Sequence, residues 1–149
     1  MGGGVIRTLS HELDLAMYWF GKPKSYIGVV DRLSNLKIDV DDFALISLKM
    51  GNNCRINFEL DFFSPYNVNQ GELFNDYGKY EWDMAGIYFT PYTETEKKLI
   101  KEFDSFETIY QKQIDDFLLF VEDGKSKNCV YQDALNIVEL INSIESKLN

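Results

Sequence analysis

The sequence predicts the α+β class: a mostly antiparallel open sheet with helices packed on one face. Three observations lead to this prediction. The chain opens with a helical pattern, continues with a run of strand-like segments, and closes with two further helical stripes. Strands that follow one another in sequence pair as antiparallel neighbours, and helices outside that run cover one face of the sheet. No repeat or low-complexity segment interrupts this order.

The first helix is expected at Ser10–Phe20, where apolar residues recur at helical spacing. Thr8 and Ser10 are both possible N-caps, because a hydroxyl can accept a hydrogen bond from the first backbone N–H groups of a helix. Gly21 and Pro23 end the helix. The apolar face contains Leu13, Met17 and Phe20, with Trp19 beside them.

Three strands are expected next, at Ser25–Leu33, Asp42–Met50 and Cys54–Phe62. The last two alternate apolar and polar residues around a turn at Gly51–Asn53, which predicts an antiparallel hairpin. One face contains Ile27, Val29 and Leu33 in the first strand, Ala44, Ile46, Leu48 and Met50 in the second, and Cys54, Ile56, Phe58, Leu60 and Phe62 in the third. The opposite face of the third strand contains Arg55, Asn57, Glu59 and Asp61.

A second hairpin is expected from Glu72–Asn75 and Lys79–Met84, which flank the turn sequence DYG. Gly86–Phe89 is expected to be the last full strand. Thr93–Glu107 is polar and is interpreted as a loop with a short edge strand at Lys98–Phe103. The shared face of the second hairpin strand contains Tyr80, Trp82 and Met84.

After these strands, the apolar residues no longer alternate as in a strand but recur at the spacing of a helix. Helices are expected at Thr108–Val121 and Tyr131–Leu148, separated by a loop in which Gly124 stops the first of them. The first stripe contains Tyr110, Ile114, Phe117, Leu118 and Val121, and the second contains Ala134, Val138, Ile141, Ile144 and Leu148.

Composition excludes several classes of protein. The chain has 149 residues, a net charge of −9 and a pI of about 4.6, so the phosphates of a nucleic acid would repel it. No apolar run approaches the ~20 residues of a membrane span and no secretory leader is recognisable, so we expect a cytoplasmic protein without a membrane partner. Cys54 and Cys129 are too few for a disulfide scaffold or a cysteine-based zinc site, and no metal is expected.

The chain opens on the glycines Gly2–Gly4 with no strand before them. Such a turn could hold a phosphate at a helix N-terminus, but the G-x-G-x-x-G motif that follows a strand in dinucleotide-binding domains is missing. A turn into the helix is the simpler interpretation. Because a domain seldom opens on a glycine run, we expect the chain to be part of a longer protein, cut just before this turn.

Two pairs of adjacent carboxylates, Asp41–Asp42 and Asp115–Asp116, are possible acid–base groups. Adjacent residues of a strand or helix point apart, so neither pair makes a shared site by itself, and solvated surface is the expected role. Glu12 and Asp14 lie in a first helical turn, where the helix dipole favours carboxylates.

His11 is the only histidine of the chain. It lies three residues before Asp14, so the two share a helix face, and a carboxylate can fix the tautomer of an imidazole. Histidine is also the usual residue for proton transfer near neutral pH. Composition and spacing leave two interpretations open: a catalytic His11, or a structural histidine at the front of a core helix.

The stretch GGGVIRTLSHELDLAMYWFGKP resembles the opening of the C-terminal domain of the Gfo/Idh/MocA oxidoreductases, the glucose–fructose oxidoreductase and inositol dehydrogenase family. That family has a glycine pair, an Asp, a His and a further Asp one turn later, and Gly3, Gly4, His11 and Asp14 match it. Later segments resemble the family in the same order: INFELDFFSP its central strand, GELFNDYGKYEWDM its glycine-centred hairpin, and residues 110–144 its closing helix pair.

The resemblance implies a dihydrodipicolinate-reductase-like C-terminal domain over residues 1–149, acting in substrate binding and oligomerisation. It also implies a parent enzyme that transfers hydride to or from a hydroxyl or keto carbon of a sugar, sugar nucleotide or polyol. NAD or NADP would be bound mainly by an N-terminal Rossmann domain, so this chain alone is expected to bind no cofactor. The implied partners are the sugar-type substrate, that Rossmann domain, and further copies of the chain associated through the open sheet face.

The resemblance implies catalysis by His11 and substrate contacts from Arg7, Thr8 and Asp14. Thr8 stands where the family has its catalytic Asp, and a hydroxyl cannot hold a charge. An alternative function therefore stays open: a non-enzymatic or degenerate dimerisation module of the same fold.

Overall fold

The computed structural model describes residues 3–51, 53–65, 68–124 and 131–146. The chain divides into two compact units, which are described separately. The first unit is formed by residues 1–64 and 128–149, and the second by residues 65–127. The first unit contains α1 (Gly4–Thr8), α2 (Ser10–Phe20), β1 (Ser25–Asp31), β2 (Phe43–Lys49), β3 (Arg55–Asp61) and α4 (Tyr131–Ser146). The second contains β4 (Gly71–Asn75), β5 (Gly78–Trp82), β6 (Gly86–Pro91), β7 (Lys98–Glu102) and α3 (Phe106–Asp123).

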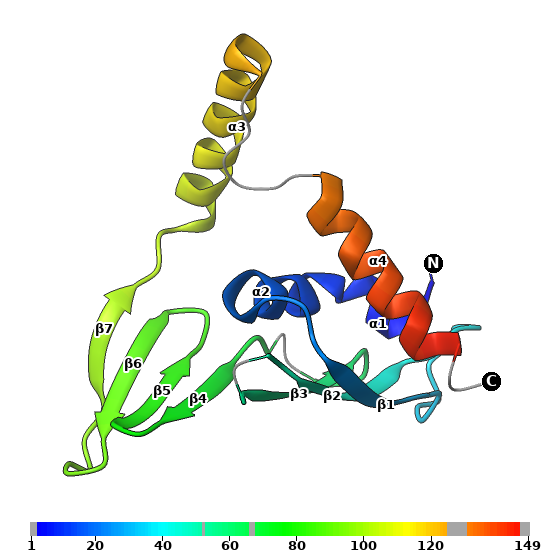
Figure 1. The fold of residues 1–149 in the computed structure, drawn as a ribbon, viewed down its shortest axis with the longest axis horizontal. Helices are drawn as coiled ribbons and strands as arrows, with labels where there is room; N and C mark the ends of the chain where they lie inside the picture. The colour runs from blue at the N-terminus through cyan, green and yellow to red at the C-terminus, as the bar shows by residue number, and fades with distance from the viewer. Residues whose placement is uncertain (1–2, 52, 66–67, 125–130, 147–149) are drawn as a thin grey trace. The chain divides into compact units, whose positions relative to one another are not determined.

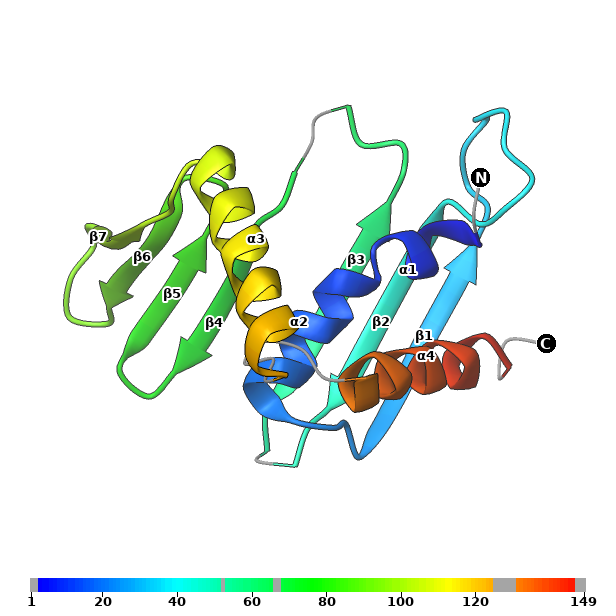
Figure 2. The same cartoon turned by 90° about the horizontal axis from the view of Figure 1, so that it is seen from above.

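The first unit is an antiparallel sheet in the order β1-β2-β3, covered on one face by α1, α2 and α4 (Figures 1 and 2). The α+β class and the hairpin of β2 and β3 are confirmed. The expected turn of this hairpin includes Asn52, which lies outside the described residues, as does Leu148 at the expected end of the last helix.

The inward residues of the central strand β2, Ala44, Ile46 and Leu48, belong to the same buried cluster as residues of all three helices. Every fully buried hydrophobic side chain among the described residues belongs to the first unit. Burial of such a side chain contributes about 1.5–3 kcal/mol, so this cluster is the main source of stability in that unit. Its members are Val5, Ile6, Leu13, Ala44, Ile46, Leu48, Met50, Leu60, Ile137, Leu140, Ile141 and Ile144, with Ala16 also buried beside them.

The strand β1 turns the opposite face inward from the one its apolar residues predict. Ile27 and Val29 are exposed, whereas Tyr26 and Val30 pack against the core, and Leu33 lies beyond the end of the strand. The inward position between them is Gly28, where an added Cβ would lie 3.2 Å from Cγ2 of Ile144. Helix α4 packs so closely on this strand that the centre of its inner face has no room for a branched side chain.

The helix α1 was not anticipated, and neither predicted N-cap of α2 is used as one. Leu9 is the N-cap of α2 and makes no side-chain cap, Ser10 is the first residue of the helix, and the Thr8 hydroxyl bonds the Gly4 carbonyl oxygen at 2.8 Å. A serine or threonine in a helical turn bonds back to the carbonyl four residues earlier when it is not a cap.

Asp41 caps the start of α1. The backbone N–H of Val5 donates to Oδ2 of Asp41 at 2.7 Å and, at 3.2 Å, to its carbonyl oxygen. Gly4 has a φ of +85°, and an added Cβ there would overlap the Asp41 carboxylate. The glycine is therefore required both by its backbone conformation and by the carboxylate that replaces a side chain at this point.

Asp42 is fully buried, so the prediction of a solvated surface residue is wrong for it. Its carboxylate accepts hydrogen bonds from the N–H of Leu33 at 2.7 Å and from the N–H and hydroxyl of Ser34. Burial alone would raise the pKa of this carboxyl. The bonds from Ser34 and Leu33, helped by the nearby charge of Arg32, outweigh burial and hold the pKa below its ordinary value.

The second unit is an antiparallel sheet in the order β4-β5-β6-β7. The second predicted hairpin and the edge strand β7 are confirmed. The strands were expected to form a single sheet, but they form two sheets. Helix α3 begins after the cap Ser105 and ends at Gly124 in a left-handed conformation, as predicted from that glycine. None of its residues is buried, and Asp115 in its exposed surface accepts a bond from Gln111 at 2.9 Å.

Replacement of Gly4 by alanine should lower the free energy of unfolding by about 1–3 kcal/mol, because the new Cβ meets the Asp41 carboxylate and the positive φ is strained. Urea denaturation measures this. Gly51→Ala is the matched control: a Cβ there meets only Lys24 Cε at 3.7 Å, so a change within about 0.5 kcal/mol is expected. Equal effects of the two substitutions would contradict the assigned role of Gly4.

Asp42→Asn should destabilise the protein most at neutral pH. Because the pKa of Asp42 is lower in the folded state than in the unfolded chain, its ionised form stabilises the fold above about pH 4. This contribution is lost as the pH falls through the folded pKa. The difference in unfolding free energy between wild type and variant should thus be constant from about pH 7 to 5 and shrink below about pH 4. Asp39→Asn, an exposed carboxyl from the same loop, serves as control; a difference for Asp42→Asn that does not change with pH would refute this linkage.

Candidate functional site

An open groove of about 400 Å³ lies in the first unit, between α1–α2 on one side and α4 on the other. One wall is polar and comes from the first two helices. The other wall is aliphatic and comes from the single helix α4. The lining residues are Arg7, Ser10, His11, Asp14, Ala134, Ile137, Val138 and Ile141.

The spacing of the polar residues explains why they share the groove. Arg7, His11 and Asp14 follow one another at intervals of four and three residues, and such intervals put side chains on one face of a helix. The helices α1 and α2 are joined through the single residue Leu9, whose N–H donates to the Val5 carbonyl at 2.9 Å, so the face continues across the junction. Leu13, on another face of α2, is buried in the core.

His11 is largely exposed in the groove wall, with about 63% of its side-chain surface accessible. Its Nε2 lies 3.3 Å from Oε1 of Glu12. The sequence predicts Asp14 as the carboxylate partner, but the contact in the structure is with Glu12. The longer side chain of Glu12 reaches the imidazole from the neighbouring position, while Asp14 lines the groove one turn further along.

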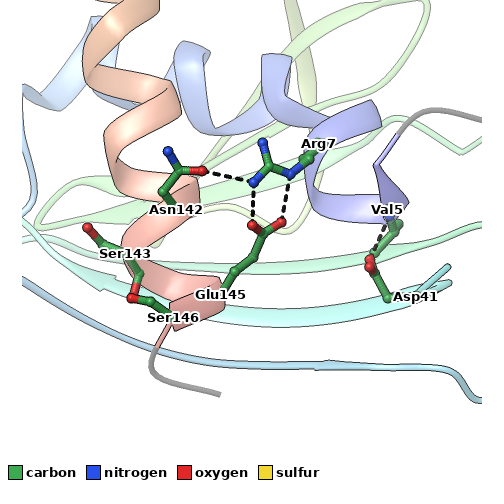
Figure 3. Close-up of polar contacts among 7 residues, drawn as sticks. All are labelled: Val5, Arg7, Asp41, Asn142, Ser143, Glu145 and Ser146. Atoms are coloured by element: carbon green, nitrogen blue, oxygen red, sulfur yellow. Dashed lines mark hydrogen bonds and ion pairs between the residues drawn. The ribbon is translucent and has the colours of Figure 1, made fainter. Parts of the chain in front are cut away.

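Arg7 is held by two residues of α4 (Figure 3). Its Nε donates to Oε1 of Glu145 at 2.9 Å, and its Nη2 pairs with Oε2 of Glu145 and donates to Oδ1 of Asn142 at 2.8 Å. Sequence analysis missed Asn142 and Glu145. Their spacing of three residues puts them on one face of α4, but nothing local shows that this face meets a residue 138 positions earlier.

Thr8 is exposed, and it is not among the residues that line the groove. The structure thus brings three of the four predicted site residues together and leaves Thr8 on the neighbouring surface. Its hydroxyl, which stands where the family has a carboxylate, is used within α1 by the bond to Gly4.

The start of α1 does not fit a nucleotide phosphate. The N–H of Val5 already donates to the Asp41 carboxylate, which places a negative charge at the position that a phosphate would take. The Asp41 carboxylate would repel a phosphate at this position, so this helix end does not fit the phosphates of a dinucleotide.

In the part of the chain that the structure describes, no three His, Cys, Asp or Glu side chains lie close enough to bind one metal ion together. Cys54 is half buried, with its Sγ 3.8 Å from the carbonyl oxygen of Arg55, and Cys129 lies outside the described residues. Within the described ranges, no helix is both long and apolar enough to cross a membrane.

Comparisons with solved structures identify the fold. A variant of a 3-ketoreductase from Actinomadura kijaniata, in complex with TDP-benzene and NADP, aligns with a TM-score of 0.78 and 15% identity over 97% of this chain and 48% of its own. An aldose–aldose oxidoreductase from Caulobacter crescentus, complexed with glycerol, aligns at 0.74 and 16% over 93% and 43%. UDP-N-acetylglucosamine 3-dehydrogenase GnnA from Acidithiobacillus ferrooxidans aligns at 0.72 and 14% over 91% and 43%.

These identities are low, so the likeness concerns the fold. The chain spans less than half the length of these three proteins. A search of curated proteins found no match. The family model described as the GFO/IDH/MocA C-terminal domain matches residues 1–81, more than half of the sequence and the part that contains the polar groove wall. The chain belongs to the GFO/IDH/MocA oxidoreductase family, as a C-terminal domain.

Proposed function

We propose that this chain is the substrate-binding domain of an NAD(P)-dependent oxidoreductase that acts on a hydroxyl or keto carbon of a sugar, sugar nucleotide or polyol. The observation that carries the proposal is the groove, in which His11 lies beside Arg7 and Asp14 and opposite an aliphatic wall. Residues 1–149 act together in substrate binding and oligomerisation. The nucleotide is held by the Rossmann domain that the family implies, since the start of α1 does not fit its phosphates.

The two walls of the groove match the two chemical sides of a sugar. A pyranose ring has apolar C–H faces and a rim of hydroxyls. Val138 and Ala134 are exposed and offer an aliphatic surface for a ring face, in a wall that the buried Ile137 and Ile141 also line, while the opposite wall offers hydrogen-bonding groups to the rim. The volume of about 400 Å³ lies in the usual range of small-molecule sites, about 300–1,000 Å³. The structural relatives include a UDP-N-acetylglucosamine 3-dehydrogenase and an aldose–aldose oxidoreductase, which supports a substrate of this class.

His11 handles the proton of the reaction. Oxidation of an alcohol removes a hydride from carbon and a proton from oxygen, and reduction returns both. The accessible imidazole of His11 can accept that proton as the neutral base and donate it as the imidazolium. The Oε1 atom of Glu12 lies 3.3 Å from Nε2 and can orient the imidazole.

The remaining predicted residues contact the substrate around this centre. Asp14, in the groove wall, can accept hydrogen bonds from substrate hydroxyls. Thr8, whose hydroxyl donates to the Gly4 carbonyl oxygen, lies on the neighbouring surface and would contact a substrate group that extends beyond the groove.

In the natural enzyme that contains this chain and its nucleotide-binding domain, His11→Asn should lower kcat by at least ~10²-fold, because general acid–base catalysis contributes about 10²–10⁴-fold. The melting temperature should change little, since the side chain is exposed. Glu12→Gln, which keeps the length of the side chain beside Nε2, should have a smaller effect on kcat. Thr8→Asp should be neutral or raise kcat, because it restores the family carboxylate. Unchanged turnover in His11→Asn would overturn the catalytic role of His11, and a wild type without turnover would favour the non-enzymatic module.

We also propose that copies of the chain associate through the outer face of the β1-β2-β3 sheet. Ile27, Val29 and Leu45 expose 77%, 50% and 48% of their surface on that face, and Val29 is paired directly with Leu45. The neighbouring strand β3 adds Arg55 and Glu59, whose opposite signs can pair across a two-fold axis.

Leu45→Lys should therefore shift the wild-type homo-oligomer toward monomers, because it puts a charge into the apolar centre of that face. Light scattering at tens of micromolar measures the mass. Leu36→Lys is the matched control, since Leu36 is an exposed leucine of the loop between β1 and β2, outside the sheet. A monomeric wild type, or equal dissociation by both substitutions, would contradict the proposed interface.

A further inference from the structure

We propose that Glu145, assisted by Asn142, makes the groove selective for uncharged substrate groups by occupying the guanidinium of Arg7. The inference rests on the proposed function, in that it takes the groove as the substrate site. It gives a specificity role to two residues of α4 for which the sequence offers no catalytic motif.

The geometry at Arg7 is that of carboxylate recognition. The Nε and Nη2 edge of the guanidinium faces both oxygens of Glu145, with the Nε–Oε1 distance at 2.9 Å, and Nη2 has Asn142 Oδ1 as a further acceptor at 2.8 Å (Figure 3). Arginine binds carboxylates and phosphates through paired N–H groups of this kind. The edge that would bind a substrate anion is therefore already filled by a carboxylate of the protein.

The charge balance in the groove follows from this pair. Arg7 is the permanent cation among the described lining residues, and Glu145 cancels its charge. Asp14 adds a negative charge to the same wall. An anionic substrate group would have to displace Glu145 from Arg7 and then lie near two carboxylates, whereas an uncharged hydroxyl needs no such exchange. If the substrate is a nucleotide sugar, its phosphates must lie outside the groove.

The position of Glu145 is set by the helix that bears it. Its neighbour Ile144 is buried in the core, and the carbonyl oxygen of Ser143 accepts a hydrogen bond from the Tyr26 hydroxyl of β1 at 2.9 Å. Helix α4 is thus anchored to the sheet on one side while it presents Asn142 and Glu145 to Arg7 on the other. The carboxylate is placed in advance, which lowers the entropy cost of holding the guanidinium.

A purely structural role for the pair is disfavoured by its exposure. The side chains of Arg7 and Glu145 are 41% and 29% exposed, and ion pairs so accessible to solvent contribute little to stability. Removal of the Glu145 charge should accordingly leave the melting temperature close to that of wild type while changing what the groove binds. Selectivity, and not folding, is the property that this substitution should alter.

The sole histidine provides a specific probe, because the ring signals of His11 in an NMR spectrum report on the groove alone. We would titrate the full chain with glucose, glucuronate and inorganic phosphate. In Glu145→Gln, the affinity for glucuronate relative to glucose should rise at least tenfold over wild type, and phosphate should begin to shift the His11 signals. Glu139→Gln, which removes the same charge from an exposed position of α4, should leave the ratio as in wild type. Arg7→Gln combined with Glu145→Gln should abolish the gain.

The outcomes separate the two proposals. If glucose shifts the His11 signals but Glu145→Gln gains neither glucuronate nor phosphate binding, the selectivity role is overturned and the sugar site stands. An equal gain in Glu139→Gln would also overturn it, since net charge would then be the cause. If neither sugar shifts His11 in any of these proteins while phosphate binds only to Glu145→Gln, the filled Arg7 edge is supported and the proposed sugar function fails.

Discussion

The packing of α4 on β1 and on the α1–α2 pair is the contact on which the rest of the first unit depends. This helix supplies Ile137, Leu140, Ile141 and Ile144 to a core that otherwise comes from the first half of the chain. An added Cβ at Gly28, on the inner face of β1, would lie 3.2 Å from Cγ2 of Ile144, and the Tyr26 hydroxyl donates to the helix at Ser143. The same helix is one entire wall of the groove. The packing of α4 therefore completes both the core and the candidate site.

The loop that precedes β2 holds the other wall in place. Asp41 caps the start of α1, and its neighbour Asp42 is buried beneath the loop that it ties through Leu33 and Ser34. Adjacent residues point apart at the start of a strand, so two identical side chains perform two different tasks. One carboxylate positions the helix that bears Arg7, and the other closes the loop behind it.

Prediction from sequence succeeded where the pattern was local. The alternation in Cys54–Phe62, the stripe in Ser10–Phe20 and the stop at Gly124 each depend on neighbouring residues, and all three appear in the structure. The shared face of His11 and Asp14 was likewise predictable from helical spacing, whereas Arg7 joins them through α1, a helix that the sequence pattern did not predict.

The errors concern contacts between segments far apart in the chain. The inner face of β1 is chosen by the space that Ile144 leaves, not by where the strand has its branched residues. Asp42 is buried because the N–H groups of a nearby loop satisfy it, which no pattern at Asp41–Asp42 reveals. Glu145 meets Arg7 across 138 positions of sequence, so its role can be seen only in three dimensions.

That sequence separation has a consequence for the order of folding. Contacts between distant segments form slowly, because a long loop must close before they give any stabilisation. The three strands β1, β2 and β3 are consecutive and can pair through short connections, with α1 and α2 beside them. Helix α4 can dock only after the intervening second unit has been made. The groove is thus assembled by the last segment of the first unit to arrive, and on the ribosome a nascent chain would have its polar wall long before it had its aliphatic one.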